Sequence, residues 1–309
     1  METLYAHGKL LLSAEYMVLH GSKALAVPLQ MGQSLKRVRS EKQRSFQWKA
    51  YYQDKPWFSA ILDPLHLSVV SASDQPKAET LCRLIRSCVE LMPAFQEDLF
   101  RWDVETHLDF SPDWGFGSSS TLIALLSEWA EVNPLDLHFM TSEGSGFDVA
   151  CAIAEGPILY RLREDGPHYQ HIRFNPPFAD QLFFVLLGNK QPTASHLRQK
   201  ASGLRPDYRT LHQFSMLTDR MVEAQDLAQF RITMEEHEEI LSGLLGMERV
   251  SSNRFPDLQG SVKSLGAWGG DFVMIASPMP EEDLYAYLYR KNIDVIFRFH
   301  DLVYEENDL

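Results

Sequence analysis

The sequence predicts an α+β protein made of two domains. A chain of 309 residues is long for one hydrophobic core and comfortable for two. Strand-like and helix-like segments are mixed without the strict βαβ alternation of a doubly wound parallel sheet, which favours sheets rich in antiparallel pairs. The pattern breaks at Asn175-Pro176-Pro177. We therefore predict one domain over residues 1–178 and a second over residues 179–309.

Apolar residues follow strand and helix periods through the first domain. Strands are expected over residues 4–12, 16–29 (with a turn at 20–23), 45–52, 100–110 and 157–162. Helices are expected over residues 77–91, from the small-residue segment 114–121 to about residue 132, and over 147–154.

The second domain carries the same two kinds of pattern. Strands are expected over residues 182–187, 272–276 and 294–299, and helices across 193–245 and 281–291. The acidic run Glu235-Glu236-His237-Glu238-Glu239 falls within a helix, where its side chains point in several directions. We expect this run to be a solvated acidic face.

Composition and charge exclude several classes of protein. The formal net charge is −13, with a pI near 5.3, which argues against nucleic acid or an anionic membrane as a partner. No window approaches the roughly 20 apolar residues of a membrane span, and the N-terminal segment lacks the basic start of a signal peptide. Cys82 and Cys88 lie at core positions of a predicted helix. We predict a cytoplasmic protein with a small-molecule partner and a homodimer as its candidate assembly.

The segment Gly115-Phe-Gly-Ser-Ser-Ser-Thr121 runs directly into an apolar helix. Glycines let the backbone approach a ligand, and a helix N-terminus offers unpaired N–H groups, so the segment suits phosphates. It lacks the Gly-Lys-Ser/Thr of a Walker A loop and the third glycine of a dinucleotide fingerprint. A tight turn followed by a serine helix cap explains the same residues.

Three further segments are ambiguous when taken singly. Gly8-Lys9 on a predicted strand is followed by Glu15, and a lone strand lysine is usually solvent-exposed. Asp148 follows Glu143-Gly-Ser-Gly-Phe and fits a helix cap as well as a catalytic carboxylate. The glycine cluster at 266–270 fits a hairpin turn.

Taken in order along the chain, the four segments resemble the motifs of the GHMP kinases. Ala6-His-Gly-Lys9, followed by an apolar strand and Ala14-Glu-Tyr16, resembles that family's first motif, Pro-Gly-Lys and then Gly-Glu-His. Gly115–Ser120 is similar to its phosphate loop, 145–148 to its Ser-Gly-x-Asp motif, and 266–270 to its third glycine-rich motif. The resemblance spans almost the whole chain.

The resemblance implies an ATP- and Mg²⁺-dependent kinase. It implies an N-terminal domain like domain 2 of ribosomal protein S5 and a ferredoxin-like C-terminal domain. Asp148 would be the catalytic base and Lys9 the cation beside it. The implied ATP ligands are Gly115, Gly117, Ser118, Ser119, Ser120, Gly266, Gly269 and Gly270. The residues expected to bind the acceptor are Glu15, His20, Ser145, Gly146, Lys190, Thr193 and Arg198. Ser119 is the expected Mg²⁺ ligand, with Glu143 as a second candidate.

Within the family, the isoprenoid branch fits best. Residues 144–150 are similar to phosphomevalonate kinases, and residues 18–21 look more like mevalonate kinase. We prefer 5-phosphomevalonate as the acceptor, with mevalonate as the alternative; a diphosphomevalonate decarboxylase and a non-catalytic ligand-binding homologue stay open. The motifs depart from the family at His7, Ala14 and Trp268.

Overall fold

The computed structural model describes residues 3–40, 45–188, 203–266, 268 and 272–305. Its contacts divide the chain into two compact units. Unit 1 comprises Met1–Lys9 and Met31–Ala154. Unit 2 comprises Leu10–Gln30 and Glu155–Leu309.

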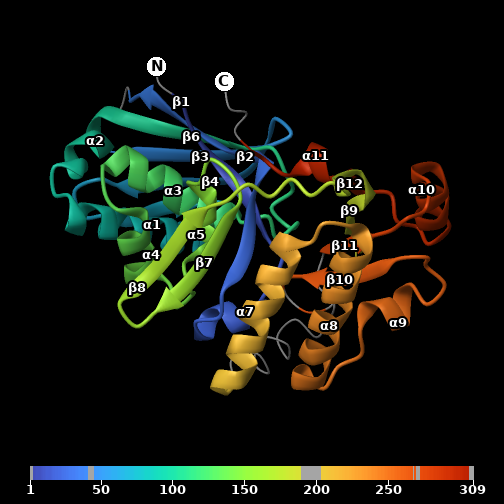
Figure 1. Ribbon diagram of the computed structural model, residues 1–309. Helices are drawn as coiled ribbons and strands as arrows, with labels where there is room; N and C mark the ends of the chain where they lie inside the picture. Colours follow the sequence, from blue (N-terminus) through green and yellow to red (C-terminus); the bar gives the residue numbers. More distant parts are fainter. Residues whose placement is uncertain (1–2, 41–44, 189–202, 267, 269–271, 306–309) are drawn as a thin grey trace. The chain divides into compact units, whose positions relative to one another are not determined.

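Unit 1 is built on a sheet in the order β5-β4-β3-β6-β2 (Figure 1). All neighbours in it are antiparallel except β3 and β6, which are parallel. The strands are β2 (Ala24–Arg39), β3 (Phe46–Tyr52), β4 (Lys55–Asp63), β5 (Ser68–Ala72) and β6 (Trp102–Leu108), and β1 (Thr3–Leu11) pairs with β2. Buried and half-buried side chains alternate along β3 and β6, because the helices of this unit cover one face of the sheet.

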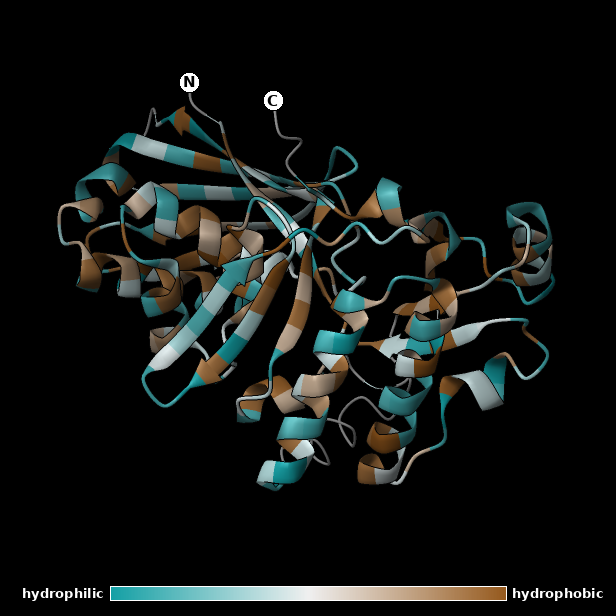
Figure 2. Ribbon diagram, in the orientation of Figure 1, coloured by the Kyte–Doolittle hydropathy of each residue, from teal (hydrophilic) through white to brown (hydrophobic). Residues whose placement is uncertain are grey.

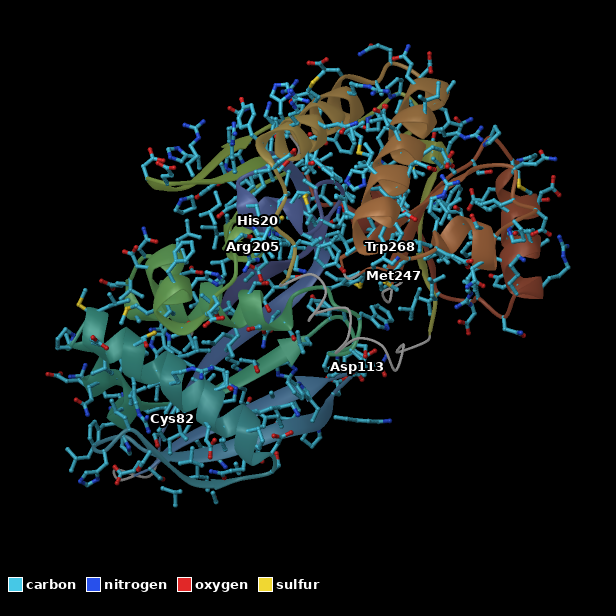
Figure 3. All side chains as sticks on the ribbon, turned by 90° about the horizontal axis from the view of Figure 1, so that it is seen from below. His20, Cys82, Asp113, Arg205, Met247 and Trp268 are labelled. Atoms are coloured by element: carbon cyan, nitrogen blue, oxygen red, sulfur yellow. The ribbon has the colours of Figure 1, made fainter. Side chains whose placement is uncertain are left out.

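Two helices of unit 1, α1 and α4, begin at residues whose side chains satisfy their first N–H groups. The side chain of Asp74 accepts from the Lys77 N–H at the start of α1, and Asn133 caps α4 in the same way. The helices are α1 (Gln75–Leu91), α2 (Phe95–Arg101), α3 (Ser118–Ala130), α4 (Pro134–Thr141) and α5 (Phe147–Ala152). Cys82 (Figure 3) and Cys88 are buried in α1, which confirms their predicted core positions.

Unit 2 contains a hairpin and a separate four-stranded antiparallel sheet. β7 (Ile158–Arg163) pairs with β8 (Gly166–His171) and with the first residues of β2. The separate sheet has the order β10-β11-β9-β12 and consists of β9 (Leu182–Leu186), β10 (Ser261–Leu265), β11 (Phe272–Ala276) and β12 (Ile296–Arg298). The helical segments are η1 (Met17–His20), η2 (Ala179–Gln181), α7 (Tyr208–Glu223), α8 (Leu227–Leu245), α9 (Val250–Arg254), α10 (Glu281–Arg290) and α11 (Phe299–Leu302).

Both faces of the four-stranded sheet are buried. Val262 and Ile275 belong to an apolar cluster with α9 and α10 residues. On the other face, Arg231 of α8 donates from Nε to Ser261 Oγ at 3.1 Å, so alternate β10 residues, including Lys263, face α8. In Figure 2, α7 and α8 show teal and brown side by side, as expected for helices with only one packed face.

The structure confirms the α+β class and most of the predicted elements. Residues 16–29 are a correction: η1 precedes β2, and β2 continues to Arg39. The sequence patterns missed β4, β5, α2, α4, β8, α9, β10 and α11. Most of these are short, and β10 is buried along its whole length, so they lack a clean period. β4 alternates in burial, but the apolar Trp57 and Ile61 occupy its half-buried positions and hide the alternation in the sequence. None of the helices within the described ranges combines the length and apolar character needed to cross a bilayer.

Candidate active site

The glycine–serine segment of unit 1 forms a left-handed turn that opens into α3. Gly115 and Gly117 have φ values of 72° and 92°, a region that glycine adopts readily. A Cβ at Gly117 would lie 2.5 Å from Ser120 Oγ and 3.0 Å from Lys9 Cε. Gly117 occupies the cap position of α3 without a side-chain hydrogen bond, so no side chain caps the first N–H groups of the helix. This start of α3 can bind an anion.

The hydroxyl groups of this segment have different environments. Ser120 is buried and donates to the Gly117 carbonyl at 2.8 Å, and Thr121 donates to Gln33 Oε1 at 2.7 Å. Ser119 is exposed, and Ser118 is half-buried; neither hydroxyl has a hydrogen-bond partner among the described residues. Ser118 and Ser119 can therefore contact a ligand through their side chains, and Ser120 only through its backbone.

Strand β1 lies against this turn. The Lys9 N–H donates to the Phe116 carbonyl at 2.9 Å, and Lys9 Nζ donates to the Gly115 carbonyl at 3.2 Å. A Cβ at Gly8 would lie 2.9 Å from the Met31 carbonyl oxygen and 3.2 Å from that of Phe116, so the approach requires glycine. Lys9 thus places a cation beside the start of α3.

Asp148 lies in the first turn of α5, but it does not cap the helix. Gly146, with a φ of 83°, holds the cap position, and within the described part of the chain Asp148 accepts only from the Val149 N–H, at 3.1 Å. Asp148 and Lys9 form no ion pair with each other, yet both charges act on the Cys151 thiol, whose pKa burial raises. The half-buried carboxylate therefore keeps capacity to accept a further hydrogen bond.

The remaining predicted residues of this segment differ in exposure. Ser145 and Gly146 are buried, and Glu143 is exposed. Among the described residues, no group of three or more His, Cys, Asp or Glu side chains is arranged to hold a metal ion. Mg²⁺ bound with nucleotide phosphates commonly uses only one or two protein ligands, and the exposed Ser119 hydroxyl fits such a donor set.

A cavity of about 310 Å³ adjoins the start of α3. Ser118, Ser119 and Leu122 form one wall, and residues of β2, β3, β4, β6 and α1 complete it. Two lining residues, Trp57 and Thr106, have buried polar atoms, Nε1 and Oγ1, with no partner among the described residues. Buried unsatisfied donors are uncommon, and a ligand in this cavity would satisfy them. Sequence analysis missed Trp57 and Thr106 because the lining comes from separate elements with no common motif.

In unit 2, the structure places the predicted acceptor residue Glu15 in the interior. Its side chain is 2% exposed and pairs with Lys263 of β10, whose side chain is fully buried. Glu15 Oε2 lies 3.3 Å from His237 Nε2. Burial raises the pKa of Glu15, and the charge of Lys263 opposes that rise.

Two residues of the acidic run on α8 complete this buried cluster, which corrects the expectation of a solvated face. His237 accepts the Ala14 N–H on Nε2 at 2.9 Å, and burial and the Lys263 charge lower its pKa well below the usual range, so the ring is neutral. Burial raises the pKa of Glu238 to about 8. Glu235, Glu236 and Glu239 lie nearer the surface and pair with arginines.

His20 lines a cavity of about 600 Å³ in unit 2, between η1, β7 and α7. Burial and the charge of Arg205 lower the pKa of His20 (Figure 3). Arg161 and Arg163 line the same cavity, and Arg161 Nε donates to the Gly21 carbonyl at 2.8 Å. The lining of this cavity is of mixed charge, because Glu164 and Asp219 also belong to it and Asp219 pairs with Lys23 at 2.7 Å.

The other predicted residues belong to two segments. Gly266 follows β10 with a φ of 70°, and a Cβ added there would meet no heavy atom within 4 Å. Lys190, Thr193, Arg198, Gly269 and Gly270 lie outside the described residues.

The sequence matches no protein-family model and no curated protein. The structure does resemble solved structures along its whole length. Phosphomevalonate kinase of Streptococcus pneumoniae, in complex with phosphomevalonate and AMPPNP, has a TM-score of 0.71 at 18% identity, over 96% of this chain and 100% of that one. Mevalonate kinase of Methanococcus jannaschii has a TM-score of 0.68 at 14% identity, over 99% and 98%.

A third neighbour acts on a sugar. Galactokinase of Lactococcus lactis, complexed with galactose, has a TM-score of 0.62 at 10% identity, over 94% of this chain and 88% of that one. The resemblance to GHMP kinases, including those of the mevalonate pathway, is therefore confirmed at the level of the fold.

The buried carboxyl of Glu238 predicts a pH-dependent stability. Between pH 4.5 and about 8 the folded state keeps a proton that the unfolded chain releases, so the free energy of unfolding falls as pH rises. One such proton contributes a slope of at most about 1.4 kcal/mol per pH unit. Chemical denaturation of Glu238→Gln should show a flatter profile and greater stability than wild type above pH 8. The exposed neighbour Glu239→Gln is the control, and parallel profiles for wild type and Glu238→Gln would contradict the assignment.

Proposed function

We propose that this protein is an ATP-dependent kinase that phosphorylates a small anionic metabolite. One observation in unit 1 carries the proposal: Lys9 lies against the uncapped start of α3, beside a cavity that shares Ser118 and Ser119 with that helix. A cation and a helix N-terminus bind phosphates, and an adjoining apolar cavity with a few polar groups suits a nucleotide base. The solved neighbour that binds AMPPNP has the same fold.

The cavity provides the features that a nucleotide base requires. Trp48, Phe58 and Leu122 supply apolar surface, while Trp57 Nε1 and the Thr106 hydroxyl can satisfy ring nitrogens of the base. The phosphates would then lie at the N–H groups that begin α3. Mg²⁺ held by the phosphates and Ser119 would neutralise charge on the transferred group.

Phosphoryl transfer depends on positioning and charge stabilisation more than on covalent chemistry by the protein. Asp148 would accept the proton of the acceptor hydroxyl, a role that suits a carboxylate with spare hydrogen-bond capacity. Lys9 would stabilise negative charge on the transferred group. Because the chain has both Lys9 and Asp148, we favour a catalytic kinase over a homologue that only binds ligands.

For the acceptor, we prefer 5-phosphomevalonate over mevalonate. A dianionic phosphate and a carboxylate need local positive charge in a protein with a net charge of −13. In the unit 2 cavity, Arg161 and Arg163 offer such charge, and Glu164 and Asp219 in the same lining oppose it. The solved neighbour with phosphomevalonate bound supports the same choice. Diphosphomevalonate decarboxylase is the second candidate, and it would release CO₂.

Three expectations from the sequence stay predictions: the domain boundary after residue 178, the cytoplasmic location and a homodimer.

Asp148→Asn should lower kcat by about 10²-fold or more while ATP still binds, because the amide cannot accept the acceptor's proton. Steady-state ADP release and calorimetric ATP titration measure the two quantities. Asp136→Asn, an exposed aspartate in the first turn of α4, is the matched control and should keep wild-type kcat. Near-wild-type kcat in Asp148→Asn would refute the base assignment.

Trp57→Phe and Thr106→Val should each weaken ATP binding by about 2- to 10-fold, the net contribution of one hydrogen bond. Neither variant should lower the melting temperature without nucleotide, because each removes a buried polar atom that lacks a partner. Trp102→Phe, at the start of the strand that carries Thr106 and not part of the cavity lining, is the control. Unchanged ATP affinity in both folded cavity variants would place the base elsewhere.

The acceptor assignment predicts a higher kcat/KM for 5-phosphomevalonate than for mevalonate. Lys190→Ala and Arg198→Ala should lower kcat/KM by about tenfold to a hundredfold with the phosphorylated acceptor only, as expected for a lost charge-assisted contact. A tenfold or greater preference for mevalonate would reject phosphomevalonate and leave the kinase assignment standing. Release of CO₂ would instead identify a decarboxylase.

A further inference from the structure

The Lys9 ammonium of unit 1 is held by two groups that carry no net charge. Its Nζ donates to the Gly115 carbonyl at 3.2 Å and lies 5.5 Å from the centroid of the Phe147 ring. The face of an aromatic ring attracts a cation because its π electrons carry partial negative charge. In the part of the chain that the structure describes, Lys9 has no ion pair, so no carboxylate neutralises its charge.

Phe147 is the first residue of α5, and the helix sets where its ring lies relative to the candidate base. Asp148 follows it, about 100° further around the helix axis, whereas Cys151 lies one turn later on the same face as Phe147. Burial raises the pKa of the Cys151 thiol, the charge of Lys9 lowers it and the charge of Asp148 raises it. The ammonium and the carboxylate therefore both lie near this thiol, although they do not pair with each other.

Two opposite charges near the same buried group ordinarily attract each other into an ion pair, since the attraction is strong where water is excluded. Such a pair would occupy the lone pairs with which Asp148 accepts a proton from the acceptor hydroxyl. It would also neutralise the charge that Lys9 offers to the transferred group. The ring of Phe147 gives the ammonium a different partner, which binds the cation without occupying the carboxylate.

We propose that Phe147 is a positioning residue: its ring holds the Lys9 ammonium at the Gly115 carbonyl and keeps it from closing onto Asp148. The proposal rests on the proposed kinase function, in which Lys9 stabilises charge on the transferred group and Asp148 accepts a proton. It adds a role for the residue between Gly146 and Asp148, to which the sequence analysis assigned none.

Two substitutions separate the π electrons of the ring from its bulk. Phe147→Leu keeps an apolar side chain without π electrons and should lower kcat by about 2- to 30-fold, the range expected for a cation–π contact. Phe147→Tyr keeps the ring face and should restore kcat to within about twofold of wild type. Phe139→Leu makes the same change at an exposed phenylalanine of α4 and is the matched control, which should keep wild-type kcat.

A double-mutant cycle with Lys9→Met tests the contact without relying on kinase activity. The equilibrium constants of unfolding of wild type, the two single variants and the double variant should show a coupling of about 2- to 30-fold, because each single variant already removes the same contact. In NMR spectra, the ring current should shift the Lys9 ε-methylene protons upfield in wild type and in Phe147→Tyr. The same protons should move downfield in Phe147→Leu.

The outcomes separate the contact, its role and the kinase function. Absent coupling, or Lys9 signals that are the same in wild type and Phe147→Leu, would refute the contact. Coupling together with wild-type kcat in Phe147→Leu would reduce Phe147 to a structural residue and overturn the positioning role. A wild-type protein that binds ATP but releases no ADP with any acceptor would reject the kinase function, while the coupling would still show that the ring holds Lys9.

Discussion

The hydrogen bond from the Lys9 N–H to the Phe116 carbonyl is the interaction on which the candidate site of unit 1 depends. It joins β1 to the glycine–serine turn, and both Gly8 and Gly117 lack a Cβ at the points where one would clash. Because the backbones approach so closely, the Lys9 ammonium meets the start of α3. The ammonium and the helix N-terminus can then attract the same anion, and together they bind it more strongly than either would alone.

The buried charges of unit 2 present a different physical problem. Lys263 is the cation of a cluster that also contains Glu15, Glu238 and His237, all nearly inaccessible to solvent. Removing charges from water is costly, and a buried ion pair often contributes little net stability. The cluster limits that cost by keeping His237 neutral and Glu238 protonated near neutral pH. The cluster also holds the turn after β1, since His237 accepts the Ala14 N–H and Glu15 pairs with Lys263.

The cavity beside α3 is marked by two buried polar atoms that have no partner among the described residues. Trp57 Nε1 and Thr106 Oγ1 are buried around a cavity next to Ser118 and Ser119, where a bound base would satisfy them. The fold is shared with solved kinases, one in complex with phosphomevalonate and AMPPNP and another with galactose. Fold alone does not select the acceptor, because a galactokinase and a phosphomevalonate kinase both share it.

The sequence by itself determined the α+β class, most strands and helices, and the local segments around Lys9, Gly115–Ser120 and Asp148, because periodicity and glycine spacing are local properties. Only the tertiary structure decided which hydroxyl is exposed, that Asp148 is not a helix cap, and that Trp57 and Thr106 share a cavity. It also showed that Glu15, His237 and Glu238 are buried, whereas the sequence predicted an acceptor ligand and a solvated acidic face. Glu15 and Lys263 are 248 residues apart, and no local pattern encodes a contact that depends on how α8 packs against β10. Burial, not residue type, decided the role of these charges.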